Sequence, residues 1–194
     1  MNQSQQGAWW KEAVIYQVYP KSFYDSNNDG IGDIQGIIAK LPYLKTLGIT
    51  MIWVSPFYLS PGADNGYDIA DYYAVNPDLG QLQDIDDLIK QAGELGIGIM
   101  VDLVVNHTSD EHRWFQAALA DPASKYRDYY IFKPAVAGAA PNNWRSIFGG
   151  SAWEKVAGEE CYYLHVFHKK QPDLNWENPQ LRQEIYAMIN WWLD

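Results

Sequence analysis

The sequence predicts an α/β chain built on a parallel sheet, and three observations lead to that fold class. Short runs of β-branched and aromatic residues alternate with longer runs whose apolar residues recur at helical spacing. The strand-like runs are almost continuously apolar rather than alternating, which is typical of parallel strands covered by helices. A closed barrel and a doubly wound sheet both satisfy this pattern. No Gly-x-Gly-x-x-Gly follows the first strand, so a dinucleotide site has no support.

The first repeat of the pattern is a strand, a helix and a second strand. Residues 14–19 read Val-Ile-Tyr-Gln-Val-Tyr before Pro20, as expected of a strand. Residues 33–47 carry apolar side chains at helical spacing and close on Gly48, a typical residue after a helix. Residues 49–54 form the second buried strand.

The pattern repeats once more and is then interrupted. A helix is expected over residues 85–95 and a third strand over 98–105, which is apolar apart from Gly98 and Asp102. Residues 108–175 lack clear periodicity, apart from one short helix expected over 114–120. So long a stretch favours an irregular inserted subdomain over a loop.

Helical periodicity returns at Asn178-Pro179, where Asn is the expected N-cap and Pro the first helical residue. This helix reaches Asp194 without a capping glycine, so we expect the chain to end within its fold. The expected organisation is the first part of a barrel over residues 1–107, an insertion over 108–175 and a third barrel helix over 176–194.

Composition limits the classes of partner. The net charge of −10 argues against nucleic acid and against an anionic membrane as partners. Cys161 is the single cysteine, which excludes an internal disulfide and fits a reducing compartment. Residues 1–7 are polar and lack the apolar stretch of a secretory signal, and no run is long enough to span a bilayer. A soluble, cytoplasmic protein is expected.

The loop Asp25-Ser-Asn-Asn-Asp-Gly-Ile-Gly-Asp33 has the spacing of a calcium loop. Oxygen-bearing side chains occupy its positions one, three, five and nine, and a glycine occupies position six. An EF-hand would place Glu at position twelve, where this chain has Gly36, and a helix rather than a strand before the loop. The alternative is a turn without metal. The expected structural calcium ligands are Asp25, Asn27, Asp29, the backbone carbonyl of Ile31, and Asp33.

Three further motifs follow predicted strands or close the insertion. Asp64-Asn-Gly-Tyr67-Asp68 follows the second strand, where a carboxylate and a nearby ring suit a sugar, although alone it is equally a turn. Asp102-Leu-Val-Val-Asn-His107 places an acid in an apolar strand, where it needs a partner. Gln171-Pro-Asp-Leu-Asn175 returns the chain to its last helix.

Together with Pro141-Asn-Asn-Trp-Arg-Ser-Ile-Phe-Gly-Gly-Ser-Ala-Trp153, these motifs resemble those of the α-amylase superfamily, glycoside hydrolase family thirteen. Within it the chain is similar to the oligo-1,6-glucosidase and α-glucosidase group, from Trp9 to Asp194. The resemblance selects the barrel: it implies the amino-terminal part of a (β/α)8 TIM barrel, namely its first three strand-helix units with the insertion after the third strand.

The resemblance also implies part of a glucose site. Asp64 and His107 would hydrogen-bond the terminal glucose, Tyr67 would stack on it, and Gln171 would lie near the entrance. Phe148 and Phe167 would be apolar walls, and Asp102 would support the catalytic groups. The loop of residues 25–33 would be the group's structural calcium site.

The catalytic residues are expected outside this sequence. The resemblance implies a retaining mechanism with an Asp nucleophile and a Glu acid/base after the fourth and fifth barrel strands, beyond Asp194. The expected activity is an α-glucosidase or oligo-1,6-glucosidase acting on short α-glucosides such as isomaltose or maltose, with these 194 residues inactive alone. Trehalose-6-phosphate hydrolase and sucrose or trehalose isomerase are alternatives on the same scaffold. A non-catalytic sugar- or calcium-binding module is a third.

Overall fold

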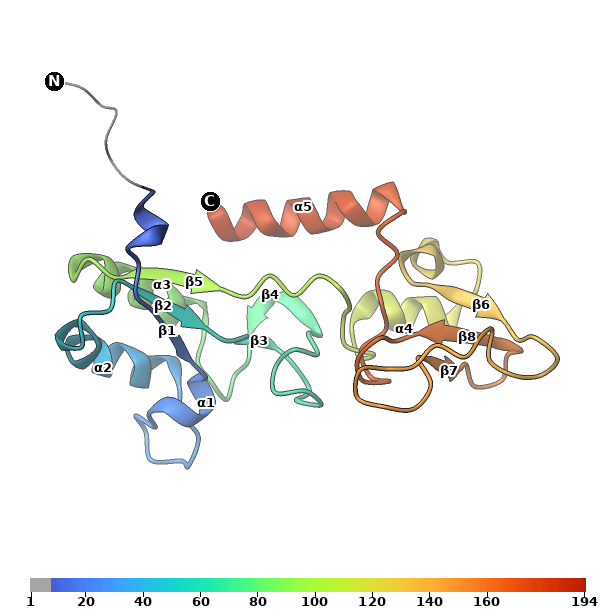
Figure 1. Ribbon diagram of the computed structural model, residues 1–194, viewed down its shortest axis with the longest axis horizontal. Coiled ribbons are helices and arrows are strands. Elements are labelled where there is room, and N and C mark those ends of the chain that lie inside the picture. Colours follow the sequence, from blue (N-terminus) through green and yellow to red (C-terminus); the bar gives the residue numbers. More distant parts are fainter. Residues whose placement is uncertain (1–7) are drawn as a thin grey trace, which may run out of the picture. The chain divides into compact units, whose positions relative to one another are not determined.

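The computed structural model describes residues 8–194 and divides into two compact units (Figure 1). Unit 1 comprises Met1–Phe57 and Val75–Asp102, and unit 2 comprises Tyr58–Ala74 and Leu103–Asp194. The polar start at residues 1–7, on which the sequence argument against a secretory signal rests, lies outside the described residues.

Unit 1 contains a three-stranded parallel sheet. Its strands follow the order β1-β2-β5, with Ile15 opposite Met51 and Met51 opposite Gly98. Parallel neighbours require crossover connections, and helices supply them here (Figure 1). The elements are η1 (Trp9–Lys11), β1 (Ile15–Val18), α1 (Pro20–Phe23), α2 (Ile34–Thr46), β2 (Met51–Val54), α3 (Leu82–Glu94) and β5 (Gly98–Val101).

The helices α2 and α3 pack against each other and carry the core of unit 1. Asp33 caps α2, because its side chain accepts a hydrogen bond from the Gly36 amide. Gly48 and Gly96 follow the two helices with φ of +80° and +69°, as expected of glycine at these ends. The fully or almost fully buried apolar residues of this unit include Ile34, Ile37, Leu41, Leu44, Ile52, Val54, Ile85 and Leu88.

Both predicted helices and the first two strands of this unit are confirmed to within a few residues. The third strand is shorter than expected, since β5 ends at Val101 rather than Val105. Asp102 therefore follows the strand instead of lying within it. The prediction that it needs a partner is confirmed, because the Trp53 indole Nε1 donates to Asp102 Oδ2 at 2.9 Å.

Unit 2 contains an antiparallel sheet of order β6-β8-β7 and a separate β3-β4 pair, of which the last residue, Val75, is assigned to unit 1. The sequence predicted the helix at 114–120 and the final helix, and both are present. The elements are β3 (Tyr58–Leu59), β4 (Asp71–Val75), α4 (Arg113–Ala120), η2 (Lys125–Tyr129), β6 (Phe132–Pro134), β7 (Trp153–Lys155), β8 (Cys161–Leu164) and α5 (Pro179–Leu193).

The stretch over 108–175 is more regular than its sequence indicated. Its three strands have only three or four residues each, too few to give a clear alternating pattern. The predicted boundaries of barrel and insertion at residues 107 and 175 stay predictions. The two compact units are defined by contacts within each unit, and these do not test where a barrel ends and an insertion begins. At the start of α5 the Asn178 side chain accepts from the amides of Gln180 and Leu181, as predicted for the N-cap. No helix in residues 8–194 is long and apolar enough to cross a membrane.

Candidate functional site

Two segments far apart in sequence run side by side in unit 2. Residues 106–110 pair with residues 170–174: the Thr108 amide donates to the Pro172 carbonyl at 3.3 Å, and the Leu174 amide donates to the Asn106 carbonyl at 2.9 Å. His107 and Asp173 face each other in an antiparallel bridge. This pairing brings the Asp102–His107 motif to the motif that begins at Gln171.

A polar cluster forms where these segments meet the loop after β3. Gln171 Nε2 donates to Asp64 Oδ2 at 2.9 Å and lies 3.0 Å from His107 Nε2. His107 Nε2 is also 3.1 Å from the backbone carbonyl oxygen of Tyr67. Gln171 and His107 are buried. Four of the predicted sugar-binding residues, Asp64, Tyr67, His107 and Gln171, thus meet in one place.

Asp68 fixes the loop that carries Asp64. It is fully buried, and it accepts hydrogen bonds from Ser60 Oγ at 3.0 Å, the Ala63 amide at 2.7 Å and the Asp64 amide at 2.9 Å. A buried carboxylate with three donors is a structural anchor. This role of Asp68 was not predicted, although its place four residues after Asp64 in a Gly-containing turn is a usable signal.

Hydrogen bonds determine which nitrogen of His107 carries the proton. The Tyr67 carbonyl can only accept, so Nε2–H donates to it. On the other side, Asn106 Nδ2 lies 3.2 Å from His107 Nδ1 and can only donate, so Nδ1 is the acceptor. Burial lowers the pKa of His107, opposed by the Tyr67 carbonyl and by the charges of Asp64 and Asp68. His107 is therefore a neutral donor at neutral pH.

Asp173 is a second buried acid beside the cluster. Its Oδ1 accepts from the Val166 amide at 3.0 Å and from Asn106 Nδ2 at 3.3 Å. Burial raises its pKa to about 6, and these two hydrogen bonds oppose the rise. The sequence analysis gave it no role in binding.

Two phenylalanine rings border the polar cluster. The Phe167 ring lies 5.2 Å from the His107 ring, centroid to centroid, and Phe148 lies 6.0 Å from Phe167. Phe148 remains 59% exposed, so its face is open to a ligand. Apolar rings beside hydrogen-bonding groups suit a sugar, whose C–H faces are apolar and whose rim is polar.

Asp102 lies in unit 1, apart from this cluster in the division of the chain, and its supporting role stays a prediction. The Tyr67 ring as a stacking platform stays a prediction as well. What the cluster offers by itself is one carboxylate acceptor, amide and imidazole donors, and an apolar border. That set recognises hydroxyl groups, and no bond-breaking step follows from it.

The proposed calcium loop is folded on itself. Asp25 Oδ1 accepts from the Asn28 amide at 2.7 Å and its Oδ2 from the Gly30 amide at 2.8 Å, and these amides lower the Asp25 pKa, that of Gly30 most. Asn27 Oδ1 accepts from the Asp29 amide at 2.9 Å, and Asp29 Oδ1 from the Ile31 amide at 2.8 Å. Asp25 Oδ1 also accepts from the Asn27 amide at 3.2 Å, whereas the other three oxygens each keep a second lone pair, so the donor set fits a hard cation.

Asp33 is less available as a cation ligand, because both of its carboxylate oxygens already accept hydrogen bonds. Its Oδ1 caps α2 through the Gly36 amide, and its Oδ2 accepts from Ser26. Within residues 8–194, no three His, Cys, Asp or Glu side chains converge as a metal cluster would. The loop supplies the right ligand types, but it does not form a closed cage.

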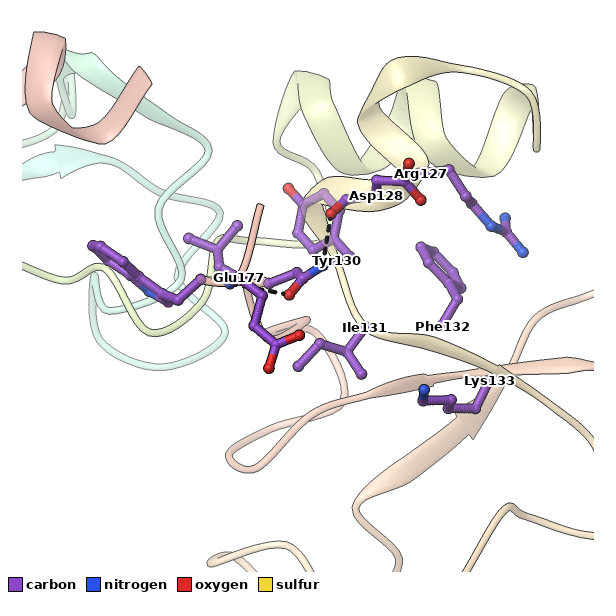
Figure 2. Close-up of a pocket in the computed structure, with 10 residues that line it drawn as sticks. Arg127, Asp128, Tyr130, Ile131, Phe132, Lys133 and Glu177 are labelled. Atoms are coloured by element: carbon purple, nitrogen blue, oxygen red, sulfur yellow. Dashed lines mark hydrogen bonds between the residues drawn. The ribbon is translucent and has the colours of Figure 1, made fainter. Parts of the chain in front are cut away.

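A cavity of unit 2 with a volume of about 660 Å³ lies elsewhere (Figure 2). Glu177 and Phe132 lie on either side of Ile131 in that view. None of the six residues predicted to bind sugar lines it. Its Arg127 is already engaged, in an ion pair with Glu159 and against the Phe132 ring. Hydrogen-bonding chemistry therefore favours the Asp64 cluster over this cavity as the sugar-binding site.

Comparison with known proteins assigns the family. The alpha-amylase catalytic domain family matches residues 17–194. The chain belongs to this family. Its α-amylase relatives include the oligo-1,6-glucosidase of Parageobacillus thermoglucosidasius, 57% identical over 96% of this chain and 33% of the relative. The alpha-glucosidase of Pediococcus pentosaceus is 54% identical, over 96% of this chain and 33% of the relative.

Solved structures of the α-amylase family agree. The isomaltulose synthase of Protaminobacter rubrum superposes with a TM-score of 0.95 at 54% identity, over 98% of this chain and 34% of that one. The trehalose-6-phosphate hydrolase of Bacillus licheniformis gives 0.92 at 51% identity, over 95% and 34%. The predicted fold class, the first part of a (β/α)8 barrel, is confirmed. The chain spans about a third of the length of these relatives.

Proposed function

We propose that this chain contributes the glucose-binding part of an α-glucosidase or oligo-1,6-glucosidase that acts on short α-glucosides with retention. The observation that carries the proposal is the convergence of Asp64, His107 and Gln171 beside Phe167 in a chain of the α-amylase family. A terminal glucose presents several hydroxyls around an apolar ring face. The cluster supplies an acceptor, two kinds of donor and an apolar border for that shape.

Bond cleavage is assigned to the parent protein rather than to these residues. In the resemblance, the nucleophile and the acid/base follow barrel strands four and five. Residues 8–194 contain the three parallel strands β1, β2 and β5. We therefore expect no hydrolysis by the 194-residue chain, and turnover of a chromogenic α-glucoside by it would overturn this expectation.

Two other activities have support from the comparisons. One solved relative is a trehalose-6-phosphate hydrolase and another an isomaltulose synthase, both above 50% identity. The parent protein should be given isomaltose, maltose, sucrose and trehalose 6-phosphate, and the products identified by chromatography. Glucose from isomaltose supports the proposal; isomaltulose from sucrose, or cleavage of trehalose 6-phosphate alone, supports an alternative.

A non-catalytic module is the candidate from another class. The same cluster would then bind sugar in the chain as it stands. Titration calorimetry with maltose and isomaltose separates the two, because the α-glucosidase proposal expects only weak binding by one side of a pocket. Micromolar affinity would favour the module.

We also propose that calcium binds the loop of residues 25–33 as a structural ion. The support is the set of oxygen donors on Asp25, Asn27 and Asp29, with the Ile31 carbonyl and Asp33 completing it. The residues would hold a cation that stiffens the turn between β1 and α2. A cytoplasmic location is proposed as well, with the lone, unpaired Cys161 as its support.

A further inference from the structure

A chain of hydrogen bonds links Asp173 to His107 through Asn106. Asn106 Nδ2 contacts both Asp173 Oδ1, at 3.3 Å, and His107 Nδ1, at 3.2 Å. Asp173 and His107 are each at most 5% exposed, whereas the Asn106 side chain between them is open to solvent. Two buried residues are therefore connected by the side-chain amide of one exposed residue.

A carboxylate fixes the orientation of that amide. An ionised carboxylate has only acceptors, so the group that Asn106 turns toward it must be its NH2. The same nitrogen then faces His107 Nδ1, which is left as an acceptor. In a neutral ring the proton is consequently on Nε2.

The position of this proton decides what His107 offers to the cluster. Nε2 has two neighbours with opposite demands: the Tyr67 carbonyl at 3.1 Å needs a proton on it, whereas the Gln171 amide nitrogen at 3.0 Å would donate to a bare nitrogen. Gln171 has a better partner in Asp64 Oδ2, and its own Oε1 is held by the His168 amide at 2.9 Å. With the proton on Nε2, His107 is a donor beside the acceptor Asp64.

We propose that Asp173 is a positioning residue of the sugar site: through Asn106 it keeps His107 as an Nε2–H donor. The consequence of this role for sugar binding rests on the proposed function, whereas the position of the proton on the His107 ring does not. Asp173 also accepts from the amide of Val166, the residue before Phe167, so it holds two sides of the cluster.

The test is the tautomer of His107 in the 194-residue chain, measured above pH 7 by long-range 1H–15N correlation. We expect Nε2 protonated and Nδ1 bare in the wild type. Asp173→Asn should retain this state, because the amide oxygen still accepts from Asn106. Asp173→Ala removes the acceptor and should raise the Nδ1-protonated fraction about fivefold, the equivalent of one ordinary hydrogen bond.

Asn106→Ala breaks the same link at an exposed residue and leaves the buried Asp173 intact, so its result stands even if Asp173→Ala does not fold. It should shift the tautomer in the same direction. A wild-type ring protonated on Nδ1, or a full Nε2–H population in Asn106→Ala, overturns the proposal. If the tautomers behave as expected while no α-glucoside perturbs the His107 signals in the parent protein, the positioning role stands and the proposed function loses its support.

Discussion

The side-chain amide of Gln171 donates to the carboxylate of Asp64 at 2.9 Å, although the two residues are 107 positions apart in the chain. This bond joins the loop after β3 to the return from the 108–175 stretch. It is a contact to a charged group, and Gln171 is fully buried. The pair therefore connects the folding of unit 2 directly to the geometry of the proposed sugar site.

Replacing Gln171 with Ala should lower both stability and substrate processing. A hydrogen bond to a charged group contributes about 1.5–3 kcal/mol, and its loss leaves Asp64 free to move. Thermal unfolding measures the first effect, and kcat/KM of the parent enzyme the second. The matched control is Gln35→Ala, since Gln35 donates to Asp84 at 2.7 Å in unit 1. Because Gln35 is exposed, this change should cost less stability than Gln171→Ala, and it should leave kcat/KM unchanged. An equal loss of activity in both variants would contradict the assignment.

His112 should cause a loss of stability in acid. It is buried at the start of α4, where its Nδ1 accepts from the Trp114 amide. Burial, with help from the charge of Arg113, lowers its pKa from 6.5 to about 3. The unfolded chain thus binds the proton first, so stability is lost as pH falls from 6.5 toward 3, by up to about 5 kcal/mol.

His112→Asn keeps an acceptor at the N-cap and removes the titrating group. Its melting temperature should be lower than that of the wild type at pH 7, because the ring no longer packs on Trp114, but should decline less between pH 6.5 and 4. Calorimetry across that range checks this prediction. Parallel pH curves for the two proteins would refute it.

Asp173 should have the opposite effect on the pH dependence of stability. Burial raises its pKa from 3.8 to about 6, so the folded chain binds the proton first between these values. This group therefore costs stability as pH rises through the window, by up to about 3 kcal/mol. Asp173→Asn should gain stability relative to the wild type at pH 8, with the gain gone at pH 4. Asp78→Asn, at an exposed aspartate, is the control for the change of residue type itself.

Gly36 should not tolerate a side chain. A Cβ there would overlap the backbone carbonyl oxygen of Tyr24, so Gly36→Ala is expected to destabilise despite the higher helix propensity of Ala. Gly93 in α3 has open space around it, and Gly93→Ala should instead stabilise by about 0.5–1 kcal/mol. Chemical denaturation of the two variants makes the comparison. The close approach also explains why a glycine occupies the twelfth loop position, where an EF-hand has Glu.

Removing calcium should destabilise the loop of residues 25–33. If the proposal is right, a chelator lowers the melting temperature, and adding calcium restores it by mass action. Asp29→Ala should abolish the response, because it removes an exposed proposed ligand together with the acceptor of the Ile31 amide. Asp78→Ala is the matched exposed control. A chelator response of the same size in Asp29→Ala would place the ion elsewhere.

Much of unit 1 could be predicted because its signals are local. The spacing of Ile34, Ile37, Leu41 and Leu44, with Gly48 after them, predicts both ends of α2 to within a few residues. The short strands β6, β7 and β8 could not be predicted in this way. β6 pairs with β8 across a long separation, with Phe132 opposite Tyr163, and even in the neighbouring pair β7-β8 three or four residues hold too little pattern to separate a strand from a loop.

The candidate site likewise contains residues that could be predicted from the sequence and residues that could not. Asp64, His107 and Gln171 were found through motifs, and the structure brings them together. The roles of Asp68 and Asp173 depend on burial and on which amides face them, and no spacing rule encodes that. Asp102 was placed in a strand because the apolar run continues to Val105, whereas the pairing with β2 stops at Val101.

The pairing of residues 106–110 with 170–174 has a consequence for evolution and engineering. The excursion between them leaves and returns at one point, since Asn106 and Asp173 touch across 67 positions. A segment closed at its base can be exchanged for a longer or shorter one with little cost in loop entropy, which grows only slowly with length. Part of the 108–172 segment is thus exchangeable: grafting a different stretch before Phe167 would re-shape the rim of the site, while Phe167 and Gln171 stay beside His107.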